Sequence, residues 1–349
     1  MDRIDFIVSR MGAPGIQYLA VDGSRMLVEH AGGWADVAGK RKMELDTTMM
    51  LYSMSKTFTA AAVLQLFEAG SAALDDPVGK HLTDIPYDDG LLIRHLLSQT
   101  SGIPNPIPLK WVHLANEHET FNENAALRSV LAKHGRLRHP PGSRYGYSNI
   151  AYWLLGMIVE KASGTSFELY MKKNIFERLG IAPSEMDIKI PLLPRHAKGY
   201  IPKWSFLDLF KSLLLEPRFL DGYEDRWFHI NDHYLNGPAF GGIVATGRAV
   251  ALFLQDQLRE RSVLFGKRTK ALFYEQQKDA YGKPIPMTLG WHLGNEKGER
   301  FYYKEGGGGG FHGEMRIYPS RTLATVAIAN DATFKAGRLL NALDGHIVK

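Results

Sequence analysis

The sequence predicts an α+β fold in which an antiparallel sheet is built from both ends of the chain and flanked by helices. Residues 15–50 alternate apolar and polar positions around turn signals, and a period of two is typical of half-buried strands. Residues 56–198 follow a helical period instead, and alternation returns after Gly237. Strands, then helices, then strands again indicate a mainly helical lobe inserted into the sheet-bearing part.

The N-terminal strands and the first long helix have clear local signals. "GIQYLAV" and "RMLVEHAG" alternate and are joined by "DG", a turn dipeptide, and "GGWAD" follows, so we expect two or three antiparallel strands. In the next segment, Phe58, Ala62 and Leu66 fall on one face of a helix that Gly70 closes.

Four stretches after Gly237 read as strands, and a last helix follows them. They are "MTLGWHLG", "RFYYKEG", "FHGEMRIYP" and "TLATVAIAN", with "AGRLLNALDGHIV" as the helix. We therefore expect residues 1–55 and 237–349 to form an α/β lobe and residues 56–236 a mainly helical lobe, with a site between the two.

Composition excludes several kinds of chemistry. The chain has no cysteine, so disulfides, thiolate nucleophiles and cysteine-bound zinc are ruled out. The net charge of +5 comes without a basic block, so we expect no nucleic-acid partner. No apolar run approaches the roughly 18 residues of a membrane span, and the charged N-terminal stretch "MDRIDFIVSRMGAPG" is unlike a signal peptide. We expect a cytoplasmic protein, or a periplasmic one if a leader has been removed.

Ser53 and Lys56, in "LYSMSKTF", open the first apolar helix. Residues three apart share a helix face, whereas Ser55 points elsewhere, so only the Ser53 hydroxyl can meet the Lys56 ammonium group. A desolvated lysine can take the proton of a serine nucleophile, and a helix N-terminus favours a developing oxyanion. The alternative is that Ser53 is an ordinary N-cap.

A second candidate pair lies in "PPGSRYGYSNIAYWLLG". Tyr147 can relay a proton, and Asn149 can donate an amide hydrogen bond to a bound acyl group. The alternative is that Asn149 caps the following helix while Tyr147 packs in the core, although one residue can serve as both cap and ligand.

The third candidate is "YYKEGGGGGFHGEMRIYP", where glycines lie between two strand patterns. Glycine in a strand lets another backbone or a ligand come close, so this strand can offer a backbone N–H to a substrate carbonyl. A phosphate-binding glycine loop would lead into a helix, whereas "FHGEMRIYP" alternates like a strand. We therefore expect no nucleotide and no other cofactor.

Together the three pieces, Ser-x-x-Lys, Tyr-x-Asn and Lys-x-Gly, resemble the motif set of serine β-lactamases and penicillin-binding proteins. The tyrosine makes the chain similar to the class C branch, with its class C β-lactamases, D-alanyl-D-alanine peptidases and family VIII carboxylesterases. The resemblance spans roughly residues 15–330, including "LDDPVGKHL", "IRHLLSQTSGIP" and "GPAFGGIVATGRAVALF". It implies a β-lactamase/transpeptidase-like fold with the active site between the lobes.

The resemblance implies roles for the catalytic side chains. Ser53 would be the acylated nucleophile, and Lys56 and Tyr147 would share the general-base and general-acid work. Asn149 would hold the acyl carbonyl or the side-chain amide of the substrate, and Lys304 would support the proton network.

On the glycine-rich strand, the resemblance implies an oxyanion hole formed by the backbone N–H groups of Ser53 and Gly307, with Gly306 next to it if the register shifts by one residue. Glu305 departs from the pattern, because β-lactam-directed members carry threonine or serine at this position. The hydroxyl of that residue is thought to help hold the substrate carboxylate. A carboxylate would repel that group, so we expect neutral esters, neutral amides or amine-bearing peptides. Pairing of Glu305 with a nearby lysine or arginine would weaken this expectation.

The stretch "KWSFLDLFKSLLLEPRF", residues 203–219, is unusually apolar. A core helix fits it best, and the alternatives are a flap that lines an acyl pocket and a surface that contacts a membrane. A flap would make medium-length acyl chains natural substrates.

Histidines offer no convincing site. His312 could belong to a Ser-His-Asp triad. However, the chain lacks a G-x-S-x-G elbow, and the sequence gives His312 no evident acidic partner. We therefore expect His312 to be a pocket-wall residue. There is no H-E-x-x-H, and His113 and His118 are five apart rather than four, so we expect no metal.

The sequence therefore predicts a serine hydrolase that acts through a covalent acyl-enzyme on small-molecule esters, a carboxylesterase. Within the same chemistry, the alternative is a β-lactamase or a peptidase acting on D-amino-acid or amide substrates. The alternative from another class is a catalytically silent ligand-binding module of the same fold.

Overall fold

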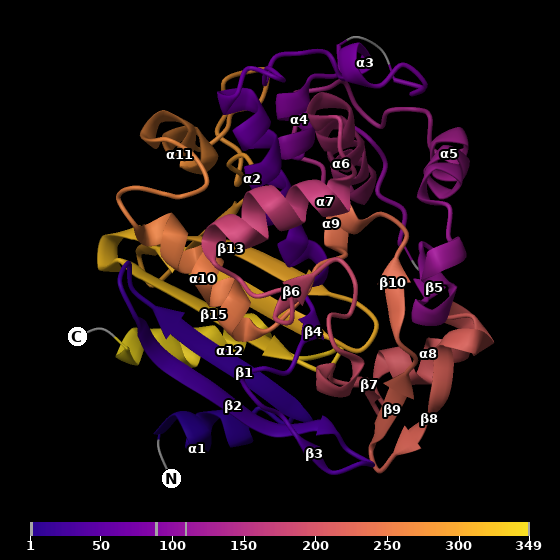
Figure 1. Cartoon of the computed structure of the whole chain (residues 1–349), viewed down its shortest axis with the longest axis vertical. Helices are drawn as coiled ribbons and strands as arrows, with labels where there is room; N and C mark the ends of the chain where they lie inside the picture. Colours follow the sequence, from indigo (N-terminus) through magenta and orange to yellow (C-terminus); the bar gives the residue numbers. More distant parts are fainter. Residues whose placement is uncertain (1–2, 88–89, 109, 348–349) are drawn as a thin grey trace.

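Both ends of the chain meet in one antiparallel sheet of seven strands, in the order β12-β13-β14-β15-β1-β2-β3. The computed structural model describes residues 3–87, 90–108 and 110–347 and shows this sheet beside a second, helix-rich lobe (Figure 1). The strands are β1 (Gly15–Val21), β2 (Met26–Asp36), β3 (Arg41–Lys42), β12 (His292–Glu296), β13 (Glu299–Gly307), β14 (His312–Tyr318) and β15 (Leu323–Ala329). The predicted α+β fold, with a sheet drawn from both chain ends, is confirmed.

Strand β1 lies next to the central strand β15 and joins the two ends of the chain, because it pairs with both β2 and β15. All residues of β1 and β15 are buried, since helices cover both faces. Ile16 and Tyr18 pack on one side with α1 and α12, and α10 packs on the other. These helices are α1 (Arg3–Ser9), α10 (Gly247–Leu258) and α12 (Ala336–Leu343); α1 was not predicted.

The second lobe is built around α2, which packs against α6 and α9. Its helices are α2 (Ser55–Glu68), α3 (Val78–His81), α4 (Ile93–Leu97), α5 (Glu123–Lys133), α6 (Asn149–Ser163), α7 (Phe167–Met171) and α9 (Pro238–Gly241), and α11 (Lys267–Tyr274) lies beside α2. Helix α2 is buried on nearly all sides, so its start is held firmly at the junction with the sheet.

Short strands that were not predicted individually lie outside the large sheet. They are β4 (Met49–Met50), β5 (Val112–Leu114), β6 (Met186–Asp187), β7 (Gly199–Pro202), β8 (Leu220–Glu224), β9 (Trp227–Ile230), β10 (His233–Leu235) and β11 (Val244–Ala245). They form three small sheets, β10-β5, β4-β11-β6 and β7-β9-β8. The boundaries of the two lobes, residues 1–55 with 237–349 and residues 56–236, stay a prediction.

Helix α8 (Phe206–Leu214) forms within residues 203–219, but it is not the core helix that we expected there. Only Asp208 of this helix is buried, and Leu213 and the preceding Trp204 are 82% and 74% exposed. The helix lies at the edge of the molecule beside β8 and β9 (Figure 1). Hydropathy alone cannot separate such a helix from a core helix, because both are rich in leucine and phenylalanine.

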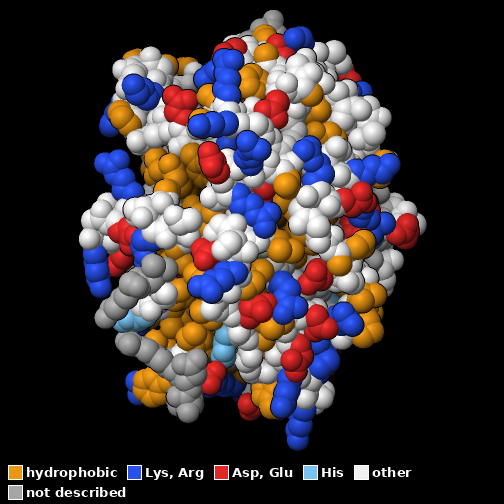
Figure 2. All heavy atoms as spheres, turned by 60° about the vertical axis from the view of Figure 1, so that its left-hand side comes forward, with side chains coloured by type: hydrophobic (Ala, Val, Ile, Leu, Met, Phe, Trp, Pro, Cys, Tyr) orange, Lys and Arg blue, Asp and Glu red, His pale blue; other side chains and the backbone are white. Residues whose placement is uncertain are grey.

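The surface carries charges of both signs. On the face shown in Figure 2, lysine and arginine side chains are interspersed with aspartate and glutamate. Within the described ranges, none of the helices combines the length and the apolar character needed to cross a bilayer.

Candidate active site

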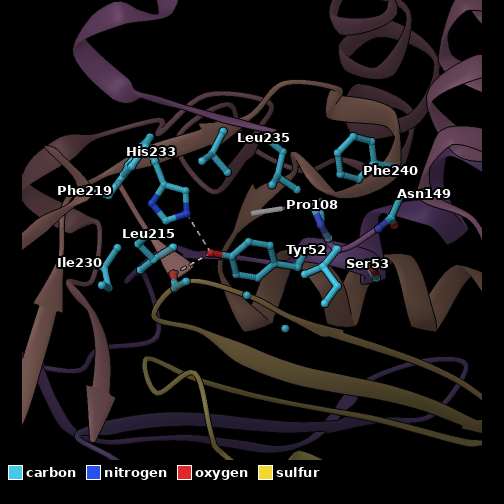
Figure 3. Close-up of a pocket in the computed structure, with 15 residues that line it drawn as sticks. Tyr52, Ser53, Pro108, Asn149, Leu215, Phe219, Ile230, His233, Leu235 and Phe240 are labelled. Atoms are coloured by element: carbon cyan, nitrogen blue, oxygen red, sulfur yellow. Dashed lines mark hydrogen bonds between the residues drawn. The ribbon is translucent and has the colours of Figure 1, made fainter. Parts of the chain in front are cut away.

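Ser53 lies in a short 3-10 turn, Tyr52–Met54, immediately before α2. Tyr52 adopts a φ of +45°, a left-handed conformation that is costly for a residue with a large side chain. Its hydroxyl donates to the carbonyl of Gly309 at 2.7 Å and lies 3.1 Å from Nε2 of His233 (Figure 3). These contacts fix the Tyr52 ring and hold the strained turn that presents Ser53.

The side chains of the first two predicted motifs meet at the Ser53 hydroxyl. Oγ of Ser53 lies 2.7 Å from the hydroxyl of Tyr147 and 2.9 Å from Nζ of Lys56. Nζ of Lys56 also donates to Oδ1 of Asn149 at 2.7 Å and to the carbonyl of Phe240 at 2.5 Å. By contrast, the Ser55 hydroxyl accepts the backbone N–H of Ile243 at 3.1 Å, so the two serines have separate surroundings.

The cap of α6 is Ser148, whose Oγ accepts the N–H of Ala151. Asn149 is the first residue of the helix rather than its cap. Its side-chain oxygen is taken by Lys56, which orients the amide nitrogen away from that contact. The alternative in which Asn149 caps this helix is therefore wrong.

Burial controls the protonation of the site. It lowers the pKa of Lys56 well below its ordinary value, with the charge of Lys304 as a second cause. Burial also lowers the pKa of Lys304 to about 7, and among the described residues the Lys304 ammonium has no hydrogen-bond partner. The pKa of Tyr147 moves the other way, since burial raises it and the hydrogen bond with Ser53 only partly opposes this. Two amines are thus easily deprotonated, whereas the phenol keeps its proton.

Two cavities meet at Ser53 and share Gly307, Gly308 and Gly309. The inner pocket, of about 240 Å³, is largely apolar and also includes Asn149, Val112, Leu235 and Phe240 (Figure 3). The outer cleft, of about 580 Å³, also includes Tyr147, His292, Tyr303, Glu305 and His312. Leu215, which follows α8, lines both cavities. The segment 203–219 therefore contributes to the walls of both cavities, as the flap alternative predicts.

The glycine-rich strand passes directly beside the nucleophile turn. A Cβ on Gly306 would come within 2.1 Å of the Leu51 carbonyl oxygen and 2.9 Å of the backbone nitrogen of Ser53. No other residue type fits this position without moving the strand. Gly307 ends β13 opposite His312, and Gly306 and Gly307 line the outer cleft together with Ser53.

Glu305 and His312 form a hydrogen-bonded pair, with 2.9 Å between Oε1 of Glu305 and Nε2 of His312. His312 thus has an acidic partner, and the expectation that it had none is wrong. The partner of Glu305 is this histidine rather than the lysine or arginine considered from the sequence. The pair arises because β13 and β14 place the two residues on neighbouring positions of one sheet face.

His292 is a site residue that sequence reasoning missed. It lines the outer cleft, its ring stacks 6.4 Å from that of Tyr147, and its Nε2 lies 3.2 Å from the Tyr145 hydroxyl. Burial and the charges of Lys304 and Lys56 lower its pKa to about 2, so the ring is neutral. The stretch "MTLGWHLG" carries no motif that could have signalled it.

Potential metal ligands occur away from Ser53. Within the described residues, Asp221, Glu224 and His229 bring ligand atoms within 4.8 Å of one another, but Asp221 already pairs with His229 at 2.8 Å. His113 and His118 are in hydrogen-bond contact at 2.9 Å. The five-residue spacing argued against a metal site only for two histidines on one face of a helix. In the structure, His113 lies on strand β5 and His118 lies in the 3-10 turn that follows it.

Comparison with known proteins gives a consistent picture. A family model described as Beta-lactamase matches residues 4–349. The chain is 28% identical over 318 residues to penicillin-binding protein 4* of Bacillus subtilis, covering 89% of this chain and 67% of that protein. It is 32% identical over 165 residues to protein flp of Staphylococcus aureus, covering 45% of this chain but only 32% of flp.

Solved structures show the same fold. A penicillin-binding protein from Bacillus halodurans matches with a TM-score of 0.76 and 22% identity, covering 99% of both chains. A D-amino acid amidase from Ochrobactrum anthropi, solved with L-phenylalanine, matches with a TM-score of 0.81 and 20% identity, covering 99% of this chain and 96% of that one. Since the family model spans nearly the whole chain and these folds agree with it, the protein belongs to the family of serine β-lactamases and penicillin-binding proteins.

Proposed function

We propose that this β-lactamase-fold hydrolase is a carboxylesterase that forms a covalent acyl-enzyme on Ser53. The observation that carries the proposal is the position of the Ser53 hydroxyl, within 2.9 Å of a buried amine and 2.7 Å of a buried phenol. Such a pairing of nucleophile, base and acid is what acyl transfer through serine requires.

Lys56 is the proposed general base. A neutral amine has two protons and one lone pair, and two of its neighbours, the oxygens of Asn149 and Phe240, can only accept. The lone pair is then left for the Ser53 proton. The lowered pKa of Lys56 favours this neutral form.

Tyr147 is the proposed general acid. Its raised pKa keeps the phenol protonated, so it donates to Oγ of Ser53 and then to the departing oxygen. Oγ gives its proton to Lys56 and attacks the acyl carbon, the C–O bond to the alcohol breaks, and the alcohol leaves with the proton of Tyr147. Water then attacks the acyl carbon and returns a proton to Tyr147, the bond to Oγ breaks, and Oγ takes back the proton held by Lys56 as the acid leaves. Backbone N–H groups of Ser53 and Gly307 are the proposed oxyanion hole.

The acyl group is proposed to occupy the inner pocket. Asn149 lines this pocket, and its amide nitrogen is free to donate to an acyl carbonyl because Lys56 holds the oxygen. The other walls are mainly apolar and include Phe219, from the segment that follows α8. Such walls favour acyl chains of medium length over charged groups.

Hydrolysis of p-nitrophenyl butyrate and of nitrocefin, measured side by side, tests the proposal. Wild-type protein should hydrolyse the ester, and Ser53→Ala should hydrolyse neither while keeping its circular dichroism spectrum. Nitrocefin turnover faster than ester turnover by orders of magnitude would assign the site to β-lactams instead. Full activity of the alanine variant would exclude Ser53 as the nucleophile.

A further inference from the structure

The outer cleft contains an unusual charge. Among the described residues that line either cavity at Ser53, Glu305 is the only carboxylate. Its side chain is 54% exposed, so it faces whatever occupies the cleft. The hydrogen bond from His312 lowers the pKa of Glu305, and the group is therefore ionised at neutral pH.

The basic groups of the cleft leave one oxygen of Glu305 available to a ligand. Lys211 already donates to the Asp208 carboxylate at 2.8 Å and to the Tyr223 hydroxyl at 3.0 Å. His292 is neutral, because its pKa is lowered to about 2. His312 pairs with one oxygen of Glu305, and the other oxygen accepts no hydrogen bond from the described residues.

The leaving group of a substrate would enter this cleft. Tyr147 lines the outer cleft but not the inner pocket, whereas Asn149 lines only the inner pocket. A departing alcohol or amine has to lie near the phenol that gives it a proton. The acyl part and the leaving group are therefore separated, with the leaving group on the Glu305 side.

We propose that Glu305 makes the outer cleft a binding site for leaving groups that carry a positive charge, such as ammonium or quaternary ammonium groups. The inference rests on the proposed function and names its substrate class. The aromatic rings of Tyr147 and Tyr303 line the same cleft and also attract cations. Lys304 lies behind the Tyr147 ring, 5.5 Å from its centroid, and its pKa of about 7 leaves it mostly uncharged in mildly alkaline buffer.

Two butyrate esters of almost equal shape test the inference: butyrylcholine, which carries a quaternary ammonium, and 3,3-dimethylbutyl butyrate, its neutral carbon isostere. At roughly pH 8 and low salt, the wild-type kcat/KM should favour the choline ester by about 5- to 10-fold, since a partly exposed charge contributes modestly. Glu305→Gln should bring the ratio close to one. Glu299→Gln, on the same strand but outside both cavities, should keep the wild-type ratio.

The two esters also distinguish a failure of this inference from a failure of the proposed function. If the wild type hydrolyses both esters with a kcat/KM ratio near one, the inference is overturned but the proposed esterase function stands. The same conclusion follows if Glu305→Gln leaves the ratio unchanged. Hydrolysis of neither ester overturns the proposed function and the inference with it. If Glu305→Gln does not fold, the salt dependence of the wild-type ratio decides: the preference has to shrink when ionic strength rises from about 0.02 to about 0.5 M, and a constant ratio contradicts the inference.

Discussion

The hydroxyl of Tyr147 lies 2.7 Å from Oγ of Ser53, although 94 positions separate the two residues in the chain. Lys56 approaches the same oxygen from another side, at 2.9 Å. Burial lowers the pKa of the amine and raises that of the phenol. The two neighbours of the nucleophile are therefore driven to opposite protonation states, which suits one to accept a proton and the other to donate it.

Removal of either neighbour should slow turnover sharply. We expect Lys56→Ala and Tyr147→Phe each to lower kcat by roughly 10²-fold or more, because each removes a general acid–base group. Tyr170→Phe is the matched control, since Tyr170 is also buried but donates to Gln65. Steady-state kinetics with p-nitrophenyl butyrate measures all three, and near wild-type rates for Tyr147→Phe would exclude the phenol as the acid.

The buried Lys304 should make stability depend on pH. Its pKa is about 7 in the folded protein and about 10.4 in the unfolded chain. Between these values the unfolded chain binds more protons, so the free energy of unfolding should rise with pH, by at most about 1.4 kcal/mol per pH unit from this group. Urea unfolding at roughly pH 7 and pH 9 measures the rise.

Lys304→Met should reduce that rise, because it removes the proton that the unfolded chain takes up. Lys56 contributes in the same direction, so a smaller rise remains. The exposed Lys161→Met should leave the pH dependence as in wild type. An unchanged rise in Lys304→Met would show that Lys304 is not the buried neutral amine described above.

Gly306 should tolerate no side chain. The added Cβ of Gly306→Ala would meet the Leu51 carbonyl at 2.1 Å, so β13 or the Ser53 turn has to move. We expect Gly306→Ala to lose more activity than stability. Gly222→Ala, where a Cβ meets nothing within 4 Å, should change neither activity nor stability appreciably. Activity and thermal unfolding are compared for both variants, and an active Gly306→Ala would refute the close approach of the two segments.

Filling the inner pocket should shorten the preferred acyl chain. Val112→Phe adds a ring to a pocket wall and should lower kcat/KM for p-nitrophenyl octanoate by about 10-fold or more while sparing the acetate. Val263→Phe, at a partly exposed position outside the pocket, is the control. A similar loss for acetate and octanoate would place the acyl chain elsewhere.

Local patterns predicted the parts of this structure that depend on neighbours in sequence. Alternation located the strands of the large sheet, and the three-residue spacing of Ser53 and Lys56 placed both side chains on one side of a turn. The short strands β7, β8 and β9 were not predicted, because four or five residues carry too little periodicity.

Other features depend on contacts that no local pattern encodes. The Glu305–His312 pair follows from the register of β13 on β14. His292 reaches the site only because β12 pairs with β13. The apolar residues of α8 are divided between the cavity and solvent, and hydropathy cannot show that division.

Mass spectrometry after treatment with a fluorophosphonate tests the central claim, an activated Ser53, most directly. The account predicts a single covalent adduct, located on Ser53 by peptide mapping and absent from Ser53→Ala. A folded wild-type protein that stays unlabelled, or a label that persists in the alanine variant, would contradict it.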